Sequence, residues 1–323
     1  MALGTNLNSA AVLIPCYLRI ENIKTIFDAC IRNGVQNVYF SLDSSDDEIN
    51  LTIQNQIQDL INAFPRNKTR IYFRRSVVNV GCSVNIVSSI DWVFSKEDYL
   101  IVLEDDCIPS DSFFRFAFQS FNLIDQYDHI LLGCGSQFIS SNEEMNLIRQ
   151  SKYPFFWGWF TSRKRWQIMK SFFDTNERLK CINENISIYE KTYWLAGHLR
   201  ARNGFVDVWD TIVSANIVLK NLSCIVPNHN LVVNVGNDGL ATNVKSSKFT
   251  DMTTEIIEGD WQFLEMDEQY ESFVRKKVYG ISLRHLITTK ITFLLDLVRA
   301  IGHKHIQRKF LIPYNDATWL YEF

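Results

Sequence analysis

Short apolar runs alternate with longer stretches of helical periodicity through the first part of the chain. The apolar runs predict strands at 11–14, 37–42, 70–73, 99–103 and 129–133. Apolar residues at helical spacing predict helices at 20–33, 46–63, 80–94 and from 111 onward. Strands that alternate with helices in this way form a parallel sheet through right-handed crossovers. We therefore expect an α/β fold with a mostly parallel central sheet flanked by helices.

The strand predicted at 99–103 differs from the others because its apolar run is uninterrupted and three acids follow it directly. A run without in/out alternation is typical of a central strand that is covered by helices on both faces. Glu104, Asp105 and Asp106 stand at its carboxyl end, where the ligand crevice of an open α/β sheet lies. Carboxylates there can hold a divalent cation against a phosphate. The alternative is a solvated acidic turn.

The second half of the chain begins with a polar stretch and an aromatic cluster. Residues 136–151 are polar and charged, which predicts a mobile loop. Within the following cluster, Trp157 and Trp159 flank Gly158. Aromatic faces stack on the apolar faces of sugars, and glycine lets a ligand approach the backbone. These three residues are therefore candidates for binding an acceptor, and a packed aromatic core is the alternative.

Further helix and strand patterns follow the aromatic cluster. They predict a helix from 163, a helix over 205–220, a strand over 222–226, an extended segment over 230–235 and a turn over 236–239. Residues 246–269 are acidic with helical spacing. Residues 283–301 are apolar with helical spacing, and basic residues follow to 309. An apolar face with a basic end suits either packing onto the rest of the protein or peripheral contact of 283–309 with an anionic membrane surface.

Composition and charge narrow the class of protein. The 323 residues are enough for one large α/β domain with an extension. A net charge of -3 provides no basic field for nucleic acid. The 7 cysteines are scattered without a Cys-x-x-Cys pair, which suits reduced thiols. There is no secretory leader pattern and no run of ~18 apolar residues, so we expect a cytoplasmic enzyme, including one at the inner face of a membrane.

Four segments carry a resemblance to a known family. They are 14–19 (IPCYLR), 104–106 (EDD) with 109–114 (PSDSFF), 157–159 (WGW), and 208–210 (VWD) with Pro227 and 230–236 (NLVVNVG). In combination they resemble the GT-A fold nucleotide-diphospho-sugar glycosyltransferases, including the Golgi N-acetylglucosaminyltransferase that initiates complex N-glycans and bacterial haemolysin-like sugar transferases. The resemblance spans about residues 10–245, and the C-terminal tail lies outside it.

The resemblance implies a GT-A, Rossmann-like domain over 1–245. Residues 1–135 would form its nucleotide-binding half, residues 136–245 its acceptor half, and residues 246–323 a helical C-terminal extension. The implied reaction is metal-dependent inverting transfer of a hexose or N-acetylhexosamine. The expected donor is a UDP-sugar, and the expected acceptor is a hydroxyl of a glycan or glycolipid.

The resemblance also assigns the donor site. Asp106 would bind Mn²⁺ or Mg²⁺ directly, so that the metal neutralises the diphosphate leaving group. Glu104 and Asp105 would support the site through ribose and further hydrogen bonds. Asp43 would receive the base or ribose, and Arg19 would reach toward the pyrophosphate. The remaining donor-binding residues would be Pro15, Tyr17, Asn79 and Gly81.

The general base is assigned in the same way. Inverting transfer needs a group that takes the proton from the acceptor hydroxyl. Similar enzymes use an aspartate beside a tryptophan at a helix start, and Asp210 matches it. Asp207 is the nearest competitor, and N-capping of the helix is the alternative role for both acids. The chain departs from the family where a histidine usually follows the glycine-rich loop, because Asn243 stands there and an amide is a poorer metal ligand than imidazole.

Other functions share some of these features. A sugar nucleotidyltransferase needs a glycine-rich basic loop after its first strand, but residues 15–19 contain no glycine. A phosphotransferase with an aspartyl nucleophile could use 43–46, yet that motif follows the second strand without a supporting lysine pattern. A sugar-nucleotide-binding or carbohydrate-binding protein of the same fold, without turnover, is the alternative outside enzymes.

Overall fold

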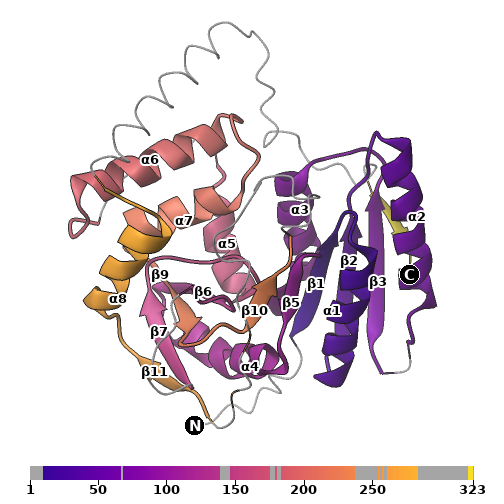
Figure 1. Cartoon of the computed structure of the whole chain (residues 1–323), viewed down its shortest axis with the longest axis horizontal. Coiled ribbons are helices and arrows are strands. Elements are labelled where there is room, and N and C mark those ends of the chain that lie inside the picture. Colours follow the sequence, from indigo (N-terminus) through magenta and orange to yellow (C-terminus); the bar gives the residue numbers. More distant parts are fainter. Residues whose placement is uncertain are drawn as a thin grey trace, which may run out of the picture.

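The computed structural model describes residues 10–66, 68–138, 146–174, 179, 183–236, 254, 257, 260–282 and 319–322. It has an α/β fold in which a large, mostly parallel central sheet is flanked by helices (Figure 1). The fold class predicted from the alternating sequence pattern is confirmed at this level.

The strands are β1 (Ala11–Cys16), β2 (Asn37–Leu42), β3 (Arg70–Ser76), β4 (Tyr99–Val102), β5 (Cys107–Pro109), β6 (Ile130–Cys134), β7 (Leu147–Ser151), β8 (Trp159–Ser162), β9 (Ser223–Pro227), β10 (Val232–Asn234), β11 (Gln262–Leu264) and β12 (Trp319–Glu322). The helices are α1 (Ile20–Arg32), α2 (Glu48–Ala63), α3 (Cys82–Phe94), α4 (Asp111–Gln126), α5 (Arg163–Ser171), α6 (Ile188–Arg202), α7 (Asp210–Leu219) and α8 (Glu268–Phe273), which continues as a π-helix over Val274–Val278.

The described part of the main sheet has the strand order β11-β7-β9-β6-β8-β4-β1-β2-β3-β12. β3, β2, β1 and β4 run parallel, as the alternating pattern predicts. β8 is inserted antiparallel between β4 and β6, so the two halves of the chain share one sheet. β5 and β10 form a separate antiparallel ribbon. The carboxyl ends of β1, β2 and β4 therefore lie at one edge, which is where an open α/β sheet binds its ligands.

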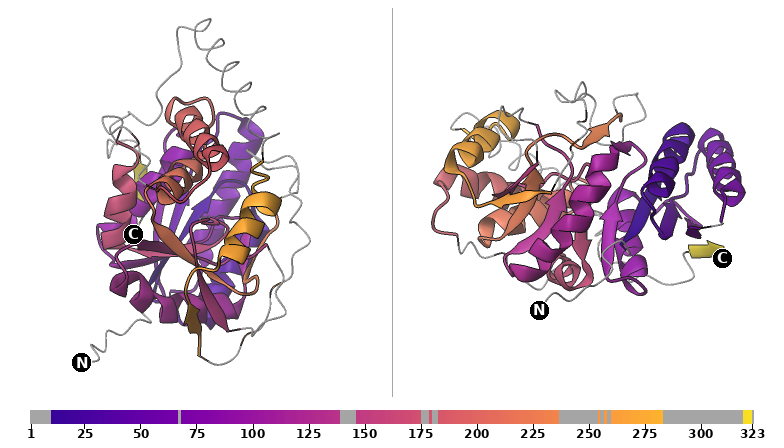
Figure 2. Two further views of the ribbon diagram at one scale, coloured as in Figure 1. Left: turned by 90° about the vertical axis from the view of Figure 1, so that its left-hand side faces the viewer. Right: turned by 90° about the horizontal axis from the view of Figure 1, so that it is seen from below.

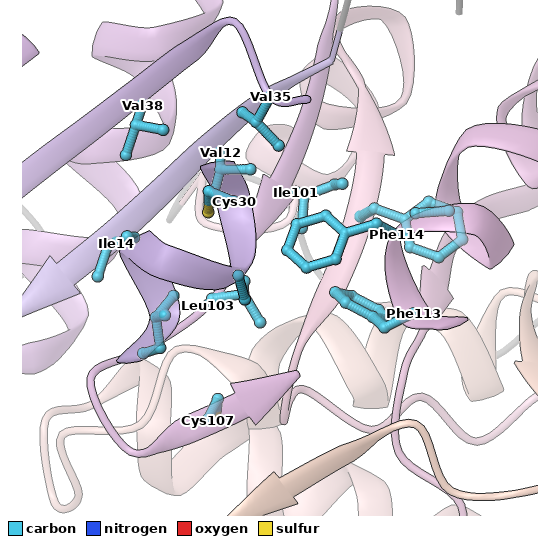
Figure 3. Packing of buried hydrophobic residues seen from close by; sticks show 14 of the residues in the cluster. Val12, Ile14, Cys30, Val35, Val38, Ile101, Leu103, Cys107, Phe113 and Phe114 are labelled. Carbon is cyan, nitrogen blue, oxygen red and sulfur yellow. The ribbon is translucent and has the colours of Figure 1, made fainter. Parts of the chain in front are cut away.

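Both faces of the sheet are buried, and successive residues of β1 show this directly. Val12 and Ile14 belong to the hydrophobic cluster under α1, α2 and α4, whereas Ala11 and Leu13 belong to the cluster under α3, α5, α6 and α7. Figure 3 shows the first cluster, in which Phe113 and Phe114 of α4 pack near the strand residues. Figure 2 shows the helices on both sides of the sheet. Helices on both faces leave only the strand ends for a ligand.

The structure corrects the loop predicted at 136–151. Its last part is the strand β7, which pairs with β9 and β11. Leu147 and Ile148 are buried, and the buried Arg149 donates from Nε to Asn228 at 3.2 Å. The polar side chains of this segment bond to residues that are distant in sequence. The local polarity of the segment gives no sign of these partners, and for this reason it predicted a loop.

Helix boundaries in the second half also differ from the prediction. The helix predicted over 205–220 begins only at Asp210, and the residues before it are irregular. The helix α6 was not predicted. Its buried positions include Glu190 and His198, and such polar core residues weaken the amphipathic pattern on which the prediction relied.

The described residues of the C-terminal extension include strands as well as helix. They contribute β11 and β12 to the two ends of the main sheet, and β11 lies within the stretch 246–269 that was predicted to be helical, before α8 begins at Glu268. The helix predicted at 283–301, its basic end and Asn243 all lie outside the described residues. Among the residues that are described, no helix is long and apolar enough to cross a membrane.

Candidate functional site

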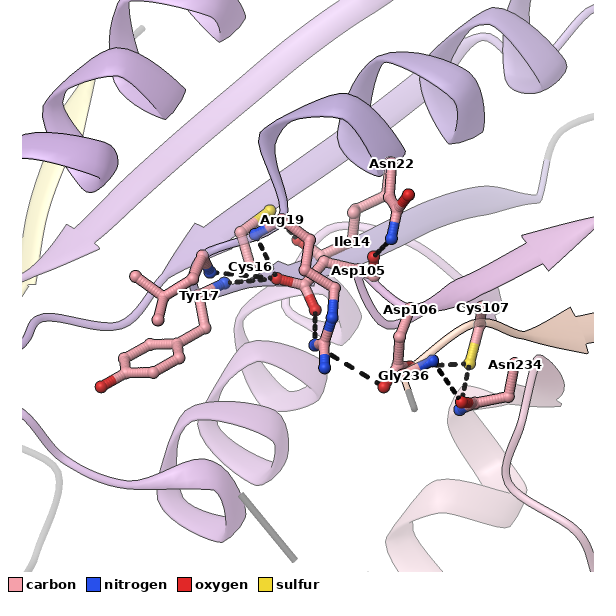
Figure 4. Close-up of polar contacts among 11 residues, drawn as sticks. Ile14, Cys16, Tyr17, Arg19, Asn22, Asp105, Asp106, Cys107, Asn234 and Gly236 are labelled. Carbon is pink, nitrogen blue, oxygen red and sulfur yellow. Dashed lines mark hydrogen bonds and ion pairs between the residues drawn. The ribbon is translucent and has the colours of Figure 1, made fainter. Parts of the chain in front are cut away.

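The acidic turn after β4 lies at the carboxyl edge of the sheet, between β1 on one side and the β5–β10 ribbon on the other. β4 ends at Val102, and the turn contains Glu104, Asp105 and Asp106 before β5 begins at Cys107. Figure 4 shows the contacts of Asp105 and Asp106. The two aspartates point to different neighbours, so the triplet does not act as one uniform surface.

Asp105 is a structural carboxylate that holds the loop after β1. Its Oδ2 accepts the backbone N–H groups of Tyr17, Leu18 and Arg19 at 2.8, 3.3 and 3.4 Å. These groups precede α1, whose N-cap residue provides no side-chain cap of its own. Asp105 is 5% exposed. It therefore supplies the negative charge that the start of a helix favours, and it shapes the predicted donor loop from within.

Arg19 links Asp105 to Asp106. Its Nη1 lies 2.9 Å from Asp105 Oδ1 and 3.6 Å from Asp106 Oδ2 (Figure 4). The guanidinium group thus lies beside the acids at the sheet edge, where the resemblance places the pyrophosphate. Tyr17 contributes its backbone N–H to Asp105, while its ring points away from both aspartates in Figure 4. Pro15 is buried inside β1, which continues to Cys16, so it supports the loop without reaching a ligand.

Asp106 lies at the junction with the β5–β10 ribbon. Its backbone carbonyl accepts the N–H of Val235 at 2.8 Å, and the Cys107 thiol donates to its Oδ1 at 3.3 Å. An ideal Cβ on Gly236 would lie 2.5 Å from Asp106 Oδ2. Glycine at 236 therefore leaves open the space beside this carboxylate. The side chain of Asp106 is 20% exposed, so Asp106 is more accessible than Asp105.

Glu104 completes the triplet with a different environment. It is half-buried, and no described residue forms a hydrogen bond or ion pair with its carboxylate. Burial, followed by the charges of Asp106 and Asp210, raises the pKa of Glu104 well above its usual value. Burial and the Asp105 charge likewise raise the pKa of Asp106, while Arg19 opposes this shift. Crowded carboxylates with raised pKa values favour the approach of a cation.

The donor set fits a divalent cation that a substrate helps to bind. No group of three or more His, Cys, Asp or Glu side chains among the described residues could enclose a metal ion. Mg²⁺ is commonly held by one or two carboxylates together with substrate phosphates, and it prefers oxygen ligands. Asp106 provides such an oxygen beside the space at Gly236. The described residues therefore suit Mn²⁺ or Mg²⁺ bound together with a diphosphate, and by themselves they do not enclose a metal.

Asp43 organises the neighbouring loop at the carboxyl ends of β2 and β3. Its Oδ1 accepts hydrogen bonds from Ser44 N, Ser76 Oγ and Val80 N, and its Oδ2 accepts from Gly81 N at 2.9 Å. Asp43 is 4% exposed. These protein donors occupy both carboxylate oxygens, so Asp43 shapes the loop before α3. Direct contact with a base or ribose stays a prediction.

Asn79 and Gly81 belong to the same loop. Gly81 is the N-cap residue of α3 and has a φ of 84°, a conformation that favours glycine. The Asn79 side chain is exposed and accepts the Gly81 N–H at 3.0 Å. Both residues set the backbone path into α3, and Asn79 remains accessible to a ligand.

The two candidate bases have different surroundings. Asp207 Oδ1 accepts the N–H of Ser83 at 3.4 Å, so Asp207 connects the irregular segment before α7 to the first turn of α3. Asp210 is the first residue of α7, and its Oδ1 accepts the Thr211 N–H at 2.6 Å. Burial raises the pKa of Asp210, and the hydrogen bonds from Thr211 partly offset this. Asp210 is thus a stronger base than an exposed aspartate, and its charge helps to raise the pKa of Glu104.

The aromatic cluster divides into buried and accessible parts. Trp159 is completely buried in β8 and packs against Phe156 and Trp209, with ring centroids 5.5 and 5.4 Å apart. An acceptor cannot reach it, which corrects its assignment as an acceptor-binding residue. Gly158 is also buried. It has a φ of 67°, and a Cβ there would lie 2.6 Å from Val232 Cγ2, so packing and backbone conformation explain this glycine.

Trp157 alone of the three residues is partly exposed. Its ring meets that of Phe138 edge to face, with centroids 5.1 Å apart, and its carbonyl accepts the Ser136 hydroxyl. The prediction that Trp157 contacts an acceptor is therefore compatible with its position. Phe138 extends the same aromatic surface and was not predicted from the sequence.

Several residues near the acids had no recognisable signal in the sequence. Cys82 begins α3, and the charges of Glu104, Asp207 and Asp210 contribute to raising the pKa of its thiol after burial. Tyr193 on α6 and Tyr279 beyond α8 are partly buried phenols, and burial, together with the charge of Asp210, raises their pKa values. The segments of these residues are remote in sequence from the acidic turn, and only the fold brings Cys82 near Glu104 and the two tyrosines near Asp210.

The structure brings the four segments of the resemblance together. Asp105 joins 104–106 to 14–19, and the β5–β10 ribbon joins 107–109 to 232–234. Gly158 packs on Val232, and Trp209 packs on Trp159. In comparisons with known proteins, no protein-family model and no curated protein matches the chain. The function is therefore inferred from the site itself.

Proposed function

We propose that this chain is a metal-dependent inverting glycosyltransferase with a GT-A fold. It would transfer a sugar from a nucleotide-diphosphate sugar, with UDP as the expected nucleotide, to a hydroxyl of a glycan or glycolipid. The observation that carries the proposal is the carboxyl edge of β1 and β4. There the accessible carboxylate of Asp106 lies beside Arg19 and the open space at Gly236, and Asp210 lies close enough to affect the pKa of Glu104.

Donor binding would use the charges at the sheet edge. Mn²⁺ or Mg²⁺ held by Asp106 would supply Lewis-acid neutralisation of the diphosphate leaving group. Arg19 would add a fixed cation, because Asp105 holds its guanidinium at 2.9 Å. The loops organised by Asp105 and Asp43 would form the walls around the nucleotide. In this role both aspartates act through the backbone that they hold.

The transfer step would use Asp210 as the general base. Its carboxylate would accept the proton of the acceptor hydroxyl while that oxygen forms a bond to the anomeric carbon. The bond from the anomeric carbon to the phosphate oxygen breaks on the opposite face, and the nucleotide diphosphate leaves with the electron pair. A pKa raised by burial makes the Asp210 carboxylate a stronger base than an exposed aspartate. Trp157 would hold the acceptor sugar by stacking.

Nucleotide release tests the proposal. The purified chain is incubated with a panel of UDP-sugars and Mn²⁺, Mg²⁺ or a chelator, and free UDP is measured with and without glycan acceptors. We expect metal-dependent UDP release by the wild type and a loss of about 100-fold in Asp106→Asn. Asp59→Asn is the matched control, because Asp59 is an exposed acid on α2 and its replacement should leave the rate unchanged.

Calorimetric titration with UDP and Mn²⁺ separates the competing functions. Metal-dependent binding without release from any donor would favour a binding protein of the same fold. If the chain shows no UDP release and no metal-dependent binding of UDP, the proposal is overturned.

A further inference from the structure

Thr211 contacts the carboxylate of Asp210 through two donors. Its backbone N–H donates to Asp210 Oδ1 at 2.6 Å, and its hydroxyl donates to the same oxygen at 3.4 Å. Both of these contacts are made to the same carboxylate oxygen, Oδ1. This oxygen is therefore held by the neighbouring residue.

The position of Thr211 is in turn set by α6. An ideal Cβ on Gly197 would lie 3.1 Å from Thr211 Cγ2, which is closer than ordinary van der Waals contact. The Thr211 methyl group thus lies close against α6 at Gly197, where an added Cβ would push it aside. With the methyl group held there, the hydroxyl remains directed at Asp210.

Asp210 is also anchored on its other side. Trp209 is 3% exposed, and its ring meets Phe156 edge to face, with centroids 4.7 Å apart. The backbone of Asp210 therefore lies between a tryptophan fixed in the core and a threonine fixed against α6. A carboxylate between two anchored residues loses little freedom when it meets its substrate.

We infer that Thr211, placed by Gly197 of α6, is a positioning residue that orients the Asp210 carboxylate for proton transfer. This inference rests on the proposed function, because it concerns the base of that reaction. It assigns to α6 a role in the reaction, although α6 lies outside the segments that carry the family resemblance. Thr211 acts through Asp210 and does not itself touch the reacting atoms.

Paired substitutions at Thr211 test the inference. Thr211→Val keeps the shape and the backbone donor but removes the hydroxyl, whereas Thr211→Ser keeps the hydroxyl. We expect kcat to fall about fivefold in Thr211→Val with the donor KM unchanged, and to remain close to wild type in Thr211→Ser. Gly197→Ala is an independent variant, since it must displace Thr211, and it should lower kcat in the same way.

The pH profile distinguishes positioning from a general loss of stability. The Thr211 hydroxyl stabilises the ionised form of Asp210, so its removal should raise the pKa of Asp210. The acid limb of kcat should then move to higher pH in Thr211→Val and stay in place in Thr211→Ser. The titratable groups that face Asp210 from other elements are Glu104, Cys82, Tyr193 and Tyr279, and all are unchanged in these variants.

The outcomes separate this inference from the proposed function. If the wild type transfers sugar and Thr211→Val has the kcat and acid limb of the wild type, the positioning role is refuted and the proposed function stands. If the wild type transfers nothing, carbon-13 titration of the aspartate carboxyls decides, with the Asp210 signal assigned from its absence in Asp210→Asn. A signal that titrates at the same pH in wild type and Thr211→Val also refutes the inference.

Discussion

Asp105 Oδ2 accepts the backbone N–H of Tyr17 at 2.8 Å, although the two residues are 88 positions apart. The acid that follows β4 thus organises the loop that follows β1. The neighbouring Asp106, by contrast, faces the β5–β10 ribbon. Adjacent acids in one short motif therefore have different roles, one in holding the fold and one in meeting a ligand.

Replacing Asp105 should lower stability more than replacing Asp106. Asp105→Ala leaves three backbone N–H groups without this acceptor and removes the shorter of the two contacts between Arg19 and an aspartate, so we expect a loss of about 3 kcal/mol in the free energy of unfolding. Asp106→Ala removes a carboxylate from a crowded acidic group and should cost less than about 1 kcal/mol. Urea unfolding of both variants measures the difference. Equal losses would show that the two acids share one role.

Gly236→Ala should weaken metal-dependent nucleotide binding. The new methyl group would lie 2.5 Å from Asp106 Oδ2, so the carboxylate or the ribbon must move. We expect about a tenfold loss of UDP affinity in the presence of Mn²⁺, measured by calorimetry. Gly34→Ala is the control, because Gly34 has a φ of 71° and no atom near its Cβ position. It should cost about 1 kcal/mol of stability and leave UDP affinity unchanged.

The two candidate bases should separate in kinetics. Asp210→Asn should leave donor binding intact while reducing transfer about 1,000-fold, because the amide cannot accept the acceptor proton. Asp207→Asn retains an oxygen that can accept the Ser83 N–H, so transfer should fall by less than about tenfold. Steady-state assays measure transfer by both variants, and the affinity for UDP is the control. Near-normal transfer by Asp210→Asn would exclude it as the base.

Substitution of Trp159 should mainly affect stability, whereas substitution of Trp157 should mainly affect acceptor binding. Trp159→Ala creates a cavity in a completely buried site and should lower the free energy of unfolding by about 4 kcal/mol. Trp157→Ala removes a partly exposed ring and should lower stability less, while raising the acceptor KM about tenfold through lost stacking. Urea unfolding and acceptor titrations check the two parts. An unchanged acceptor KM in Trp157→Ala would remove this residue from the acceptor site.

Glu271 should make stability depend on pH. Burial raises its pKa from 4.5 to about 7, against the opposing effects of Ser151 and Lys152. The folded state therefore binds more protons than the unfolded state, and stability falls as pH rises from 4.5 to about 7. Above that window, ionisation of the buried Glu271 lowers the free energy of unfolding by about 3 kcal/mol.

Glu271→Gln should remove this cost. Its amide oxygen can still accept the Lys152 N–H, which lies 3.3 Å from Glu271 Oε2. We expect the variant to be more stable than the wild type at pH 8 and equal to it at pH 4, by urea unfolding across this range. Glu265→Gln is the control, since Glu265 is exposed shortly before the same helix. Parallel pH curves for wild type and Glu271→Gln would contradict this interpretation.

Much of the first half of the fold was predictable from sequence because its signals are local. Buried parallel strands require apolar runs, and the helices between them require apolar residues at helical spacing. The second half was harder to predict. Arg149 in β7 and Glu190 in α6 are buried polar residues whose partners come from other elements, so neither segment showed a clean periodic pattern.

The candidate site divides in the same way. The sequence alone placed three acids at the end of a central strand, because strand position and residue type are both local properties. Only the tertiary structure gave Asp105 and Asp106 different contacts and set Thr211 between Gly197 and Asp210. It also buried Trp159 completely and left Trp157 partly exposed. These distinctions depend on hydrogen bonds and packing between residues far apart in the chain. Such contacts form only when the elements are assembled, so no local pattern carries them.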